Sequence, residues 1–140
     1  MRDYRNEIRS YIDQLKHGDH LYFTVQNICT ENHRSFRITK QPEDSAFAPS
    51  AIIVGLLSGT DNKHSYNSFG FITDAAVYSY KKYRGGQYEK LARLLAKILR
   101  SDHDINPYTV HHSGKCFKCS RLLTTPESIL RGIGPVCAEK

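Results

Sequence analysis

The sequence predicts an α+β fold in which two helices flank an antiparallel sheet of about five strands along the chain. Two segments, residues 2–16 and 87–100, repeat apolar side chains at helical spacing. The chain between them is rich in β-branched and aromatic residues, in short segments separated by polar turns. With 140 residues and 39% hydrophobic content, the chain is long enough to bury a compact core.

The N-terminal segment, residues 2–16, is predicted to form an amphipathic helix. Charged residues separate its apolar positions, which are Tyr4, Ile8, Tyr11, Ile12 and Leu15. Gly18 is the expected stop signal, because glycine commonly follows the last turn of a helix.

Five strands are predicted between the two helices. They span residues 20–28, 35–40, 51–57, 68–73 and 75–83. The polar turn at residues 30–34 joins the first two strands as a hairpin, and Asp74 would lie at the turn of a second hairpin. The connection at residues 41–50 contains two prolines and no periodicity, so it is expected to be a loop.

A long helix is predicted over residues 87–100. Its apolar stripe consists of Tyr88, Leu91, Leu94, Leu95, Ile98 and Leu99. Lysine and arginine side chains populate the other side, as in a helix that packs one face on a sheet. Residues 102–107 interrupt the pattern, so we expect an α+β domain over residues 1–107 and a separate module over residues 108–140.

Three of the four cysteines lie in this C-terminal module. Cys116 and Cys119 have the Cys-x-x-Cys spacing, and Cys137 follows 18 positions after Cys119 in the sequence Gly-Ile-Gly-Pro-Val-Cys. The N-terminus lacks the apolar segment of a signal peptide, which predicts a cytoplasmic protein with thiols rather than disulfides. Because Zn²⁺ prefers four tetrahedral nitrogen or sulfur ligands, the pattern predicts one structural zinc ion.

The fourth zinc ligand is left open by the sequence. His112 is the leading candidate, because it lies four residues before Cys116 and Gly114 would allow the chain to turn back between them. His111 and Cys29 are alternatives, as is an acidic or exogenous ligand. A lone cysteine in an apolar-rich stretch such as the one that ends at Cys29 is more often a small buried hydrophobic residue.

The cysteine segment also resembles a known family. Cys116 to Cys137 follows the pattern Cys-x-x-Cys-(Gly/Ser)-Arg-x-Leu-Thr-x-Pro-Glu-Ser-Ile-x-x-Gly-Ile-Gly-Pro-Val-Cys, similar to an uncharacterised zinc-binding domain family. Its members occur in phage and actinobacterial proteins, sometimes as a tail on helicase-like proteins. The usual glycine after the second cysteine is Ser120 in this chain. The resemblance implies a zinc-bound module and supplies no reaction.

The charge of the chain favours an anionic partner. The formal net charge is +6 and the pI is about 9.2. A membrane span is excluded by the lack of a run of about 18 apolar residues. The basic residues predicted to contact nucleic acid or another partner are Lys81, Lys82, Arg84, Lys90, Arg93, Lys97, Arg100, Lys115, Lys118 and Arg121.

These features predict a small non-enzymatic zinc protein that binds nucleic acid or a nucleoprotein complex, encoded by a phage or other mobile element. Catalysis at the zinc is disfavoured, because three thiolates make a metal-bound water a poor acid and no H-E-x-x-H motif is present. The alternative is a protein-interaction inhibitor of a host or bacterial defence complex. Steep salt dependence of binding would favour nucleic acid over a protein partner.

Overall fold

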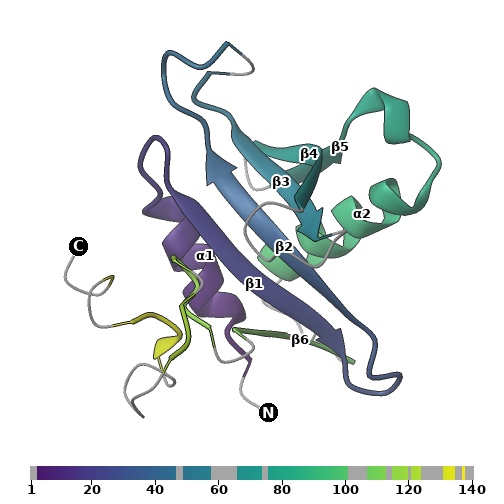
Figure 1. The fold of residues 1–140 in the computed structure, drawn as a ribbon. Helices are drawn as coiled ribbons and strands as arrows, with labels where there is room; N and C mark the ends of the chain where they lie inside the picture. The colour runs from purple at the N-terminus through teal and green to yellow at the C-terminus, as the bar shows by residue number, and fades with distance from the viewer. Residues whose placement is uncertain are drawn as a thin grey trace.

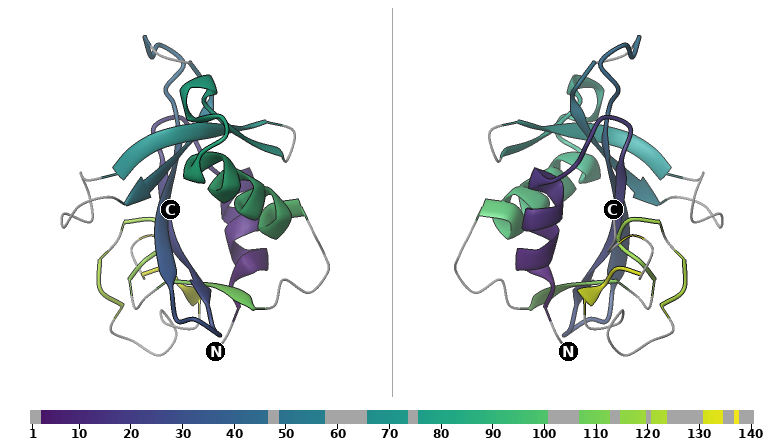
Figure 2. Two further views of the ribbon diagram at one scale, coloured as in Figure 1. Left: turned by 90° about the vertical axis from the view of Figure 1, so that its right-hand side faces the viewer. Right: turned by 90° about the vertical axis from the view of Figure 1, so that its left-hand side faces the viewer.

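The described part of the chain forms two α-helices and one curled antiparallel sheet of six strands. This computed structural model describes residues 3–46, 49–57, 66–73, 76–100, 107–112, 115–119, 121–123, 131–134 and 137. The strand order across the sheet is β5-β4-β3-β2-β1-β6. Both helices lie on the same face of the sheet (Figures 1 and 2). The predicted α+β class with an antiparallel sheet is confirmed, although its layout differs in detail.

The helices occur where the periodicity placed them. Helix α1 spans Arg5–Asp13 and is shorter at both ends than the predicted segment, whereas α2 spans Gln87–Arg100 as expected. The side chains of Ala92, Leu95 and Ile98 are buried. No helix among the described residues combines the length and the apolar character needed to cross a membrane.

The sheet contains one strand more than the sequence predicted. Its strands are β1 (His20–Asn27), β2 (His33–Lys40), β3 (Ile52–Leu57), β4 (Tyr66–Thr73), β5 (Ala76–Ser79) and β6 (Tyr108–His111). The fifth predicted strand ends early, and a 3-10 turn, η1 (Lys81–Tyr83), follows it. Strand β6 was not predicted, because four residues carry too little periodicity to identify a strand. Its backbone pairing with β1 is what makes these residues a strand.

The core lies between the sheet and the helices. Leu21 pairs with Ile38 and Phe23 with Phe36, so the alternating apolar side chains of β1 and β2 share the helix-covered face. On β4, the fully buried Phe69 stacks on Tyr88 of α2 with ring centroids 5.2 Å apart. Burial of each such side chain contributes about 2–3 kcal/mol.

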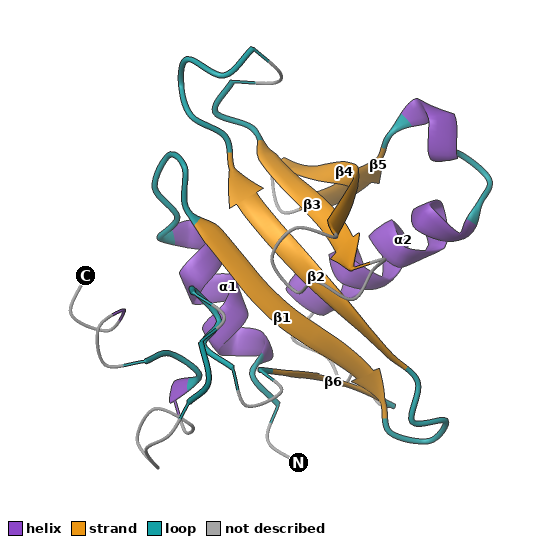
Figure 3. Cartoon of the chain, viewed as in Figure 1, coloured by secondary structure: helices purple, strands orange, loops and turns teal. Residues whose placement is uncertain are grey.

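One edge of β1 meets two different parts of the chain. From Thr24 to Asn27 it pairs with β6, and at Tyr22 its backbone N–H donates to the carbonyl of Phe117 at 2.5 Å. Figure 3 shows the C-terminal loops beside α1 and the start of β1. The beginning of β1 therefore lies directly against the segment that holds the cysteines.

Candidate metal centre

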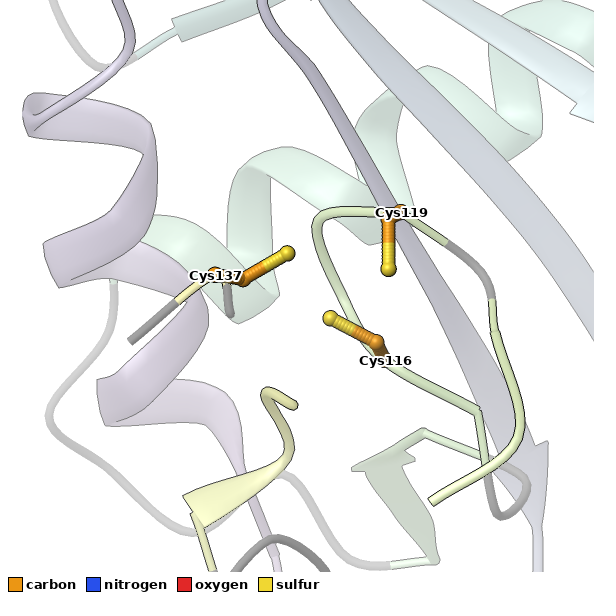
Figure 4. A group of neighbouring side chains, drawn as sticks. All are labelled: Cys116, Cys119 and Cys137. Atoms are coloured by element: carbon orange, nitrogen blue, oxygen red, sulfur yellow. The ribbon is translucent and has the colours of Figure 1, made fainter. Parts of the chain in front are cut away.

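Three cysteine sulfur atoms converge beside the sheet. The Sγ atoms of Cys116, Cys119 and Cys137 all lie within 4.8 Å of one another and point toward a common centre (Figure 4). Cys116 and Cys137 are buried, and Cys119 is half-buried. Cys29, one of the alternative ligands, is exposed in the turn after β1 and lies outside this group. The three cysteines that the spacing selected could therefore hold one metal ion.

The loop between the first two cysteines is closed by backbone hydrogen bonds. The N–H of Cys116 donates to the carbonyl of Arg121 at 2.8 Å, next to a β-bridge between Lys115 and Leu122. Two further N–H groups point at the sulfur of Cys116, one from this turn and one from the segment before Cys137. Lys118 and Gly134 donate to Cys116 Sγ at 3.4 and 3.3 Å, so both cysteine-bearing segments contribute to one thiolate environment.

Phe117, between the paired cysteines, fastens the metal segment to the protein. Its side chain is fully buried, with ring centroids 5.5 Å from Tyr4 and 6.1 Å from Tyr11 of α1. Its N–H donates to the carbonyl of Gly132 at 2.7 Å. Gly132 has φ +77°, and a Cβ on it would lie 2.1 Å from the Phe117 ring. Only glycine fits here, because the position requires both a left-handed backbone and empty space.

The electrostatics of the three thiols favour a bound cation. Burial alone would raise the pKa of Cys116, but N–H groups from Gly134, Cys119 and Lys118 outweigh burial and lower it. Burial and the neighbouring sulfur atoms of Cys119 and Cys116 raise the pKa of Cys137 to about 12. Cys137 therefore stays protonated near neutral pH unless a positive charge lies beside it. A soft divalent ion such as Zn²⁺ fits this donor set and would supply that charge.

The two predicted histidine ligands pack beside the metal segment and are not part of the close group of sulfur atoms, so the choice of fourth ligand stays a prediction. The ring of His112 packs edge-on against Tyr4 and Phe117, at centroid distances of 5.0 and 5.6 Å. His111 belongs to β6 and pairs with Thr24. Burial, aided by the nearby His112 and His33, lowers the pKa of the half-buried His111. Among the described residues, neither imidazole joins the group of three sulfur atoms.

The predicted basic residues form two separate groups. Along α2, Lys90, Arg93, Lys97 and Arg100 are all exposed, and the exposed Lys81, Lys82 and Arg84 precede the helix. In the metal segment, Arg121 is exposed, while Lys115 and Lys118 are half-buried. Helix α2 packs on the β5 end of the sheet, whereas the metal segment meets β1, toward the other end. This separation could not be predicted from the spacing of the basic residues along the chain.

The tyrosines near the first basic group differ in availability. Tyr78 on β5 is 50% exposed and lies beside Phe71, with ring centroids 5.5 Å apart. Tyr83 instead packs on Tyr88 at 4.5 Å, and both hydroxyls accept hydrogen bonds from Asn67. Tyr83 therefore has a packing role between η1 and α2, and Tyr78 is the more accessible ring.

Comparison with known protein families finds a match in the C-terminal segment. Residues 109–140 match the model of a family of unknown function (DUF6011). The match includes the three converging cysteines, the last three residues of strand β6 and Gly132. No curated protein and no solved structure matches the chain. The expected resemblance to an uncharacterised family is thus confirmed over this segment, without a function attached to it.

Proposed function

We propose that this is a small, non-enzymatic zinc protein that binds nucleic acid or a nucleoprotein complex. The convergence of three cysteine sulfur atoms within 4.8 Å carries the zinc part of the proposal. The N–H groups aimed at Cys116 support it, because such donors stabilise a metal-bound thiolate. The resemblance of the cysteine segment also supports an origin in a phage or other mobile element.

The proposed zinc is structural. Two of its three thiolate ligands are buried, and the ring of Phe117 between the paired cysteines is fixed in the core. Three thiolates place so much negative charge on the metal that a bound water would be a poor acid. The role that follows for zinc is to hold the Cys116–Cys119 loop and the Cys137 segment together.

Helix α2 supports the nucleic-acid part of the proposal. Lys90, Arg93, Lys97 and Arg100 recur at intervals of three and four residues, so they share one exposed stripe over about 15 Å of helix. Glu89 is the one acidic residue of the helix, and it pairs with Arg93 at 2.8 Å. Since the buried side chains of the helix are Ala92, Leu95 and Ile98, contact of the stripe with a phosphate backbone would exchange the surface Arg93–Glu89 pair and leave the core undisturbed.

Charge reversal tests this proposal. We expect the variant Lys90→Glu/Arg93→Glu/Lys97→Glu to lose binding to single- and double-stranded oligonucleotides while keeping the wild-type circular dichroism spectrum. The wild-type affinity should fall steeply with salt, by about 0.7–0.9 in log K per log salt for each phosphate contact. A matched variant, Lys115→Glu/Arg121→Glu, reverses charges of the other basic group and should retain most of the binding.

Two results would contradict the proposal. One is an oligonucleotide affinity that does not change with salt or with reversal of the α2 charges, which would leave the α2 stripe as an ordinary solvated face. The other is a stoichiometric complex with a protein partner that survives nuclease treatment in the absence of any oligonucleotide affinity. The second result would instead favour an inhibitor of a host or bacterial defence complex.

A further inference from the structure

The three-cysteine group is one donor short of a tetrahedral zinc site, and a neighbouring cavity contains a candidate. This cavity, of about 550 Å³, is lined by Cys119 and Cys137 together with Asp19 and His20. His20 is the first residue of β1 and Asp19 precedes it in the turn after α1, both far from the cysteines in the sequence. The fold therefore brings a nitrogen donor and an oxygen donor to a cavity that Cys119 and Cys137 also line.

Strand β1 is fixed against the cysteine loop at this point. The N–H of Tyr22 donates to the carbonyl of Phe117, which lies between Cys116 and Cys119 in sequence. His20 precedes Tyr22 by two residues, so both side chains project from the same face of the strand. Their ring centroids are 6.2 Å apart. The hydrogen bond thus sets the position of His20 relative to the cysteine loop.

The ring of His20 is arranged as that of a metal ligand usually is. Its Nδ1 lies 2.8 Å from Oγ1 of Thr39, its directly opposite partner on β2. When Nδ1 carries the proton and donates to Thr39, Nε2 presents its lone pair. Histidines that bind metals commonly donate their other ring N–H to an oxygen in this way.

Asp19 is the weaker candidate in the same cavity. Its Oδ2 accepts the backbone N–H of Lys16 at 3.0 Å, and its own N–H donates to the carbonyl of Lys16 at 2.9 Å. These bonds commit the carboxylate to the turn between α1 and β1.

We propose that Nε2 of His20 is the fourth ligand of the metal held by Cys116, Cys119 and Cys137. The inference rests on the proposed zinc site. In this structure the His20 ring is not part of the close group of sulfur atoms. Because His20 is exposed at the first position of β1, a side-chain rotation that keeps Nδ1 on Thr39 would bring Nε2 to a zinc–nitrogen distance of about 2.0–2.1 Å. The metal would then join the C-terminal segment to strand β1, which carries His20, and through Thr39 to β2.

Cobalt substitution of the full-length protein tests the ligand directly, because Co²⁺ replaces zinc and reports its thiolate ligands by charge-transfer absorption. In His20→Cys, a fourth thiolate should raise this absorption by about one third per cobalt. His20→Ala should lower zinc affinity by about 100-fold or more, and Thr39→Val by about tenfold. His112→Ala, the matched control, should leave the cobalt spectrum unchanged.

The outcomes separate this inference from the proposed function. A wild-type protein that binds one Co²⁺ with three-thiolate absorption, unchanged in both His20 variants, would overturn the role of His20 and leave the zinc site standing. A spectral change in His112→Ala alone would assign the fourth position to His112. Failure of the folded wild-type protein to bind Zn²⁺ or Co²⁺ would overturn the zinc site itself.

Discussion

The two halves of the β1 edge are held by different kinds of interaction. From Thr24 to Asn27, the strand pairs in regular register with β6, and the apolar side chains of the sheet pack under the helices. At Tyr22, one backbone hydrogen bond to Phe117 joins the strand to a loop built around three cysteines. The first half rests on interactions distributed over many residues. The second depends on a few irreplaceable groups, so it should be far more sensitive to single substitutions and to metal.

Metal removal should have the largest effect, because it should destabilise the metal segment and leave the sheet in place. Structural zinc contributes apparent binding free energies of about 10–16 kcal/mol in small zinc domains. We expect chelation, or Cys119→Ser, to abolish zinc binding and to remove hydrogen-exchange protection from the amides of Cys116 and Phe117. The amides of Phe36 and Leu56, within the β2–β3 ladder, should stay protected.

Elemental analysis should find one zinc per chain in the wild type and none in Cys119→Ser. Simultaneous loss of protection in both regions would show that the sheet and the metal segment form one cooperative unit. In that case, the division into an α+β domain of residues 1–107 and a module of residues 108–140 would be wrong.

Truncation of the Phe117 side chain should affect both the stability of the core and the affinity for zinc. Phe117→Ala removes a fully buried ring that contacts Tyr4 and Tyr11, so we expect a loss of about 3–5 kcal/mol in the free energy of unfolding. Zinc affinity should fall as well, because the ring holds the Cys-x-x-Cys loop in place. Urea unfolding and a competitive zinc titration measure the two effects.

The matched variant is Phe69→Ala, which truncates a fully buried ring under α2. It should cost a similar free energy of unfolding and leave zinc affinity unchanged. Equal zinc affinities in the two variants would mean that the Phe117 ring does not position the cysteine loop.

A pair of glycines separates backbone strain from steric conflict and gives the smallest expected effects. Gly18 and Gly132 both have positive φ, +88° and +77°. A Cβ on Gly18 would meet nothing within 4 Å, so Gly18→Ala should cost only about 1 kcal/mol of backbone strain. A Cβ on Gly132 would meet the Phe117 ring at 2.1 Å, so Gly132→Ala should cost about 1–3 kcal/mol more and weaken zinc binding.

Thermal or urea unfolding of the two variants measures this difference. Equal destabilisation would mean that the Phe117 ring moves aside at little cost, and that the metal segment is less tightly packed than the structure indicates.

The sequence by itself determined the elements whose signals are local. Helical spacing located α1 and α2, and short β-rich segments located five strands. A repeated apolar period can be recognised within one segment, without knowing which other segment it packs against. The Cys-x-x-Cys spacing identified Cys116 and Cys119, and the glycine-rich turn marked Cys137.

The tertiary structure decided what depends on distant partners. Strand β6 exists because the edge of β1 offers it a ladder, and four residues carry no such signal of their own. Proximity in sequence favoured His112 as a ligand, and the structure packs its ring against Tyr4 and Phe117, a contact that the sequence did not indicate. His20 was not predicted as a ligand, although it lines the same cavity as Cys119 and Cys137. The two regions are distant in the sequence, and only the tertiary fold places the start of β1 beside the C-terminal segment. Ligand spacing is encoded locally, whereas completion of a coordination shell depends on which distant strand the fold places beside it.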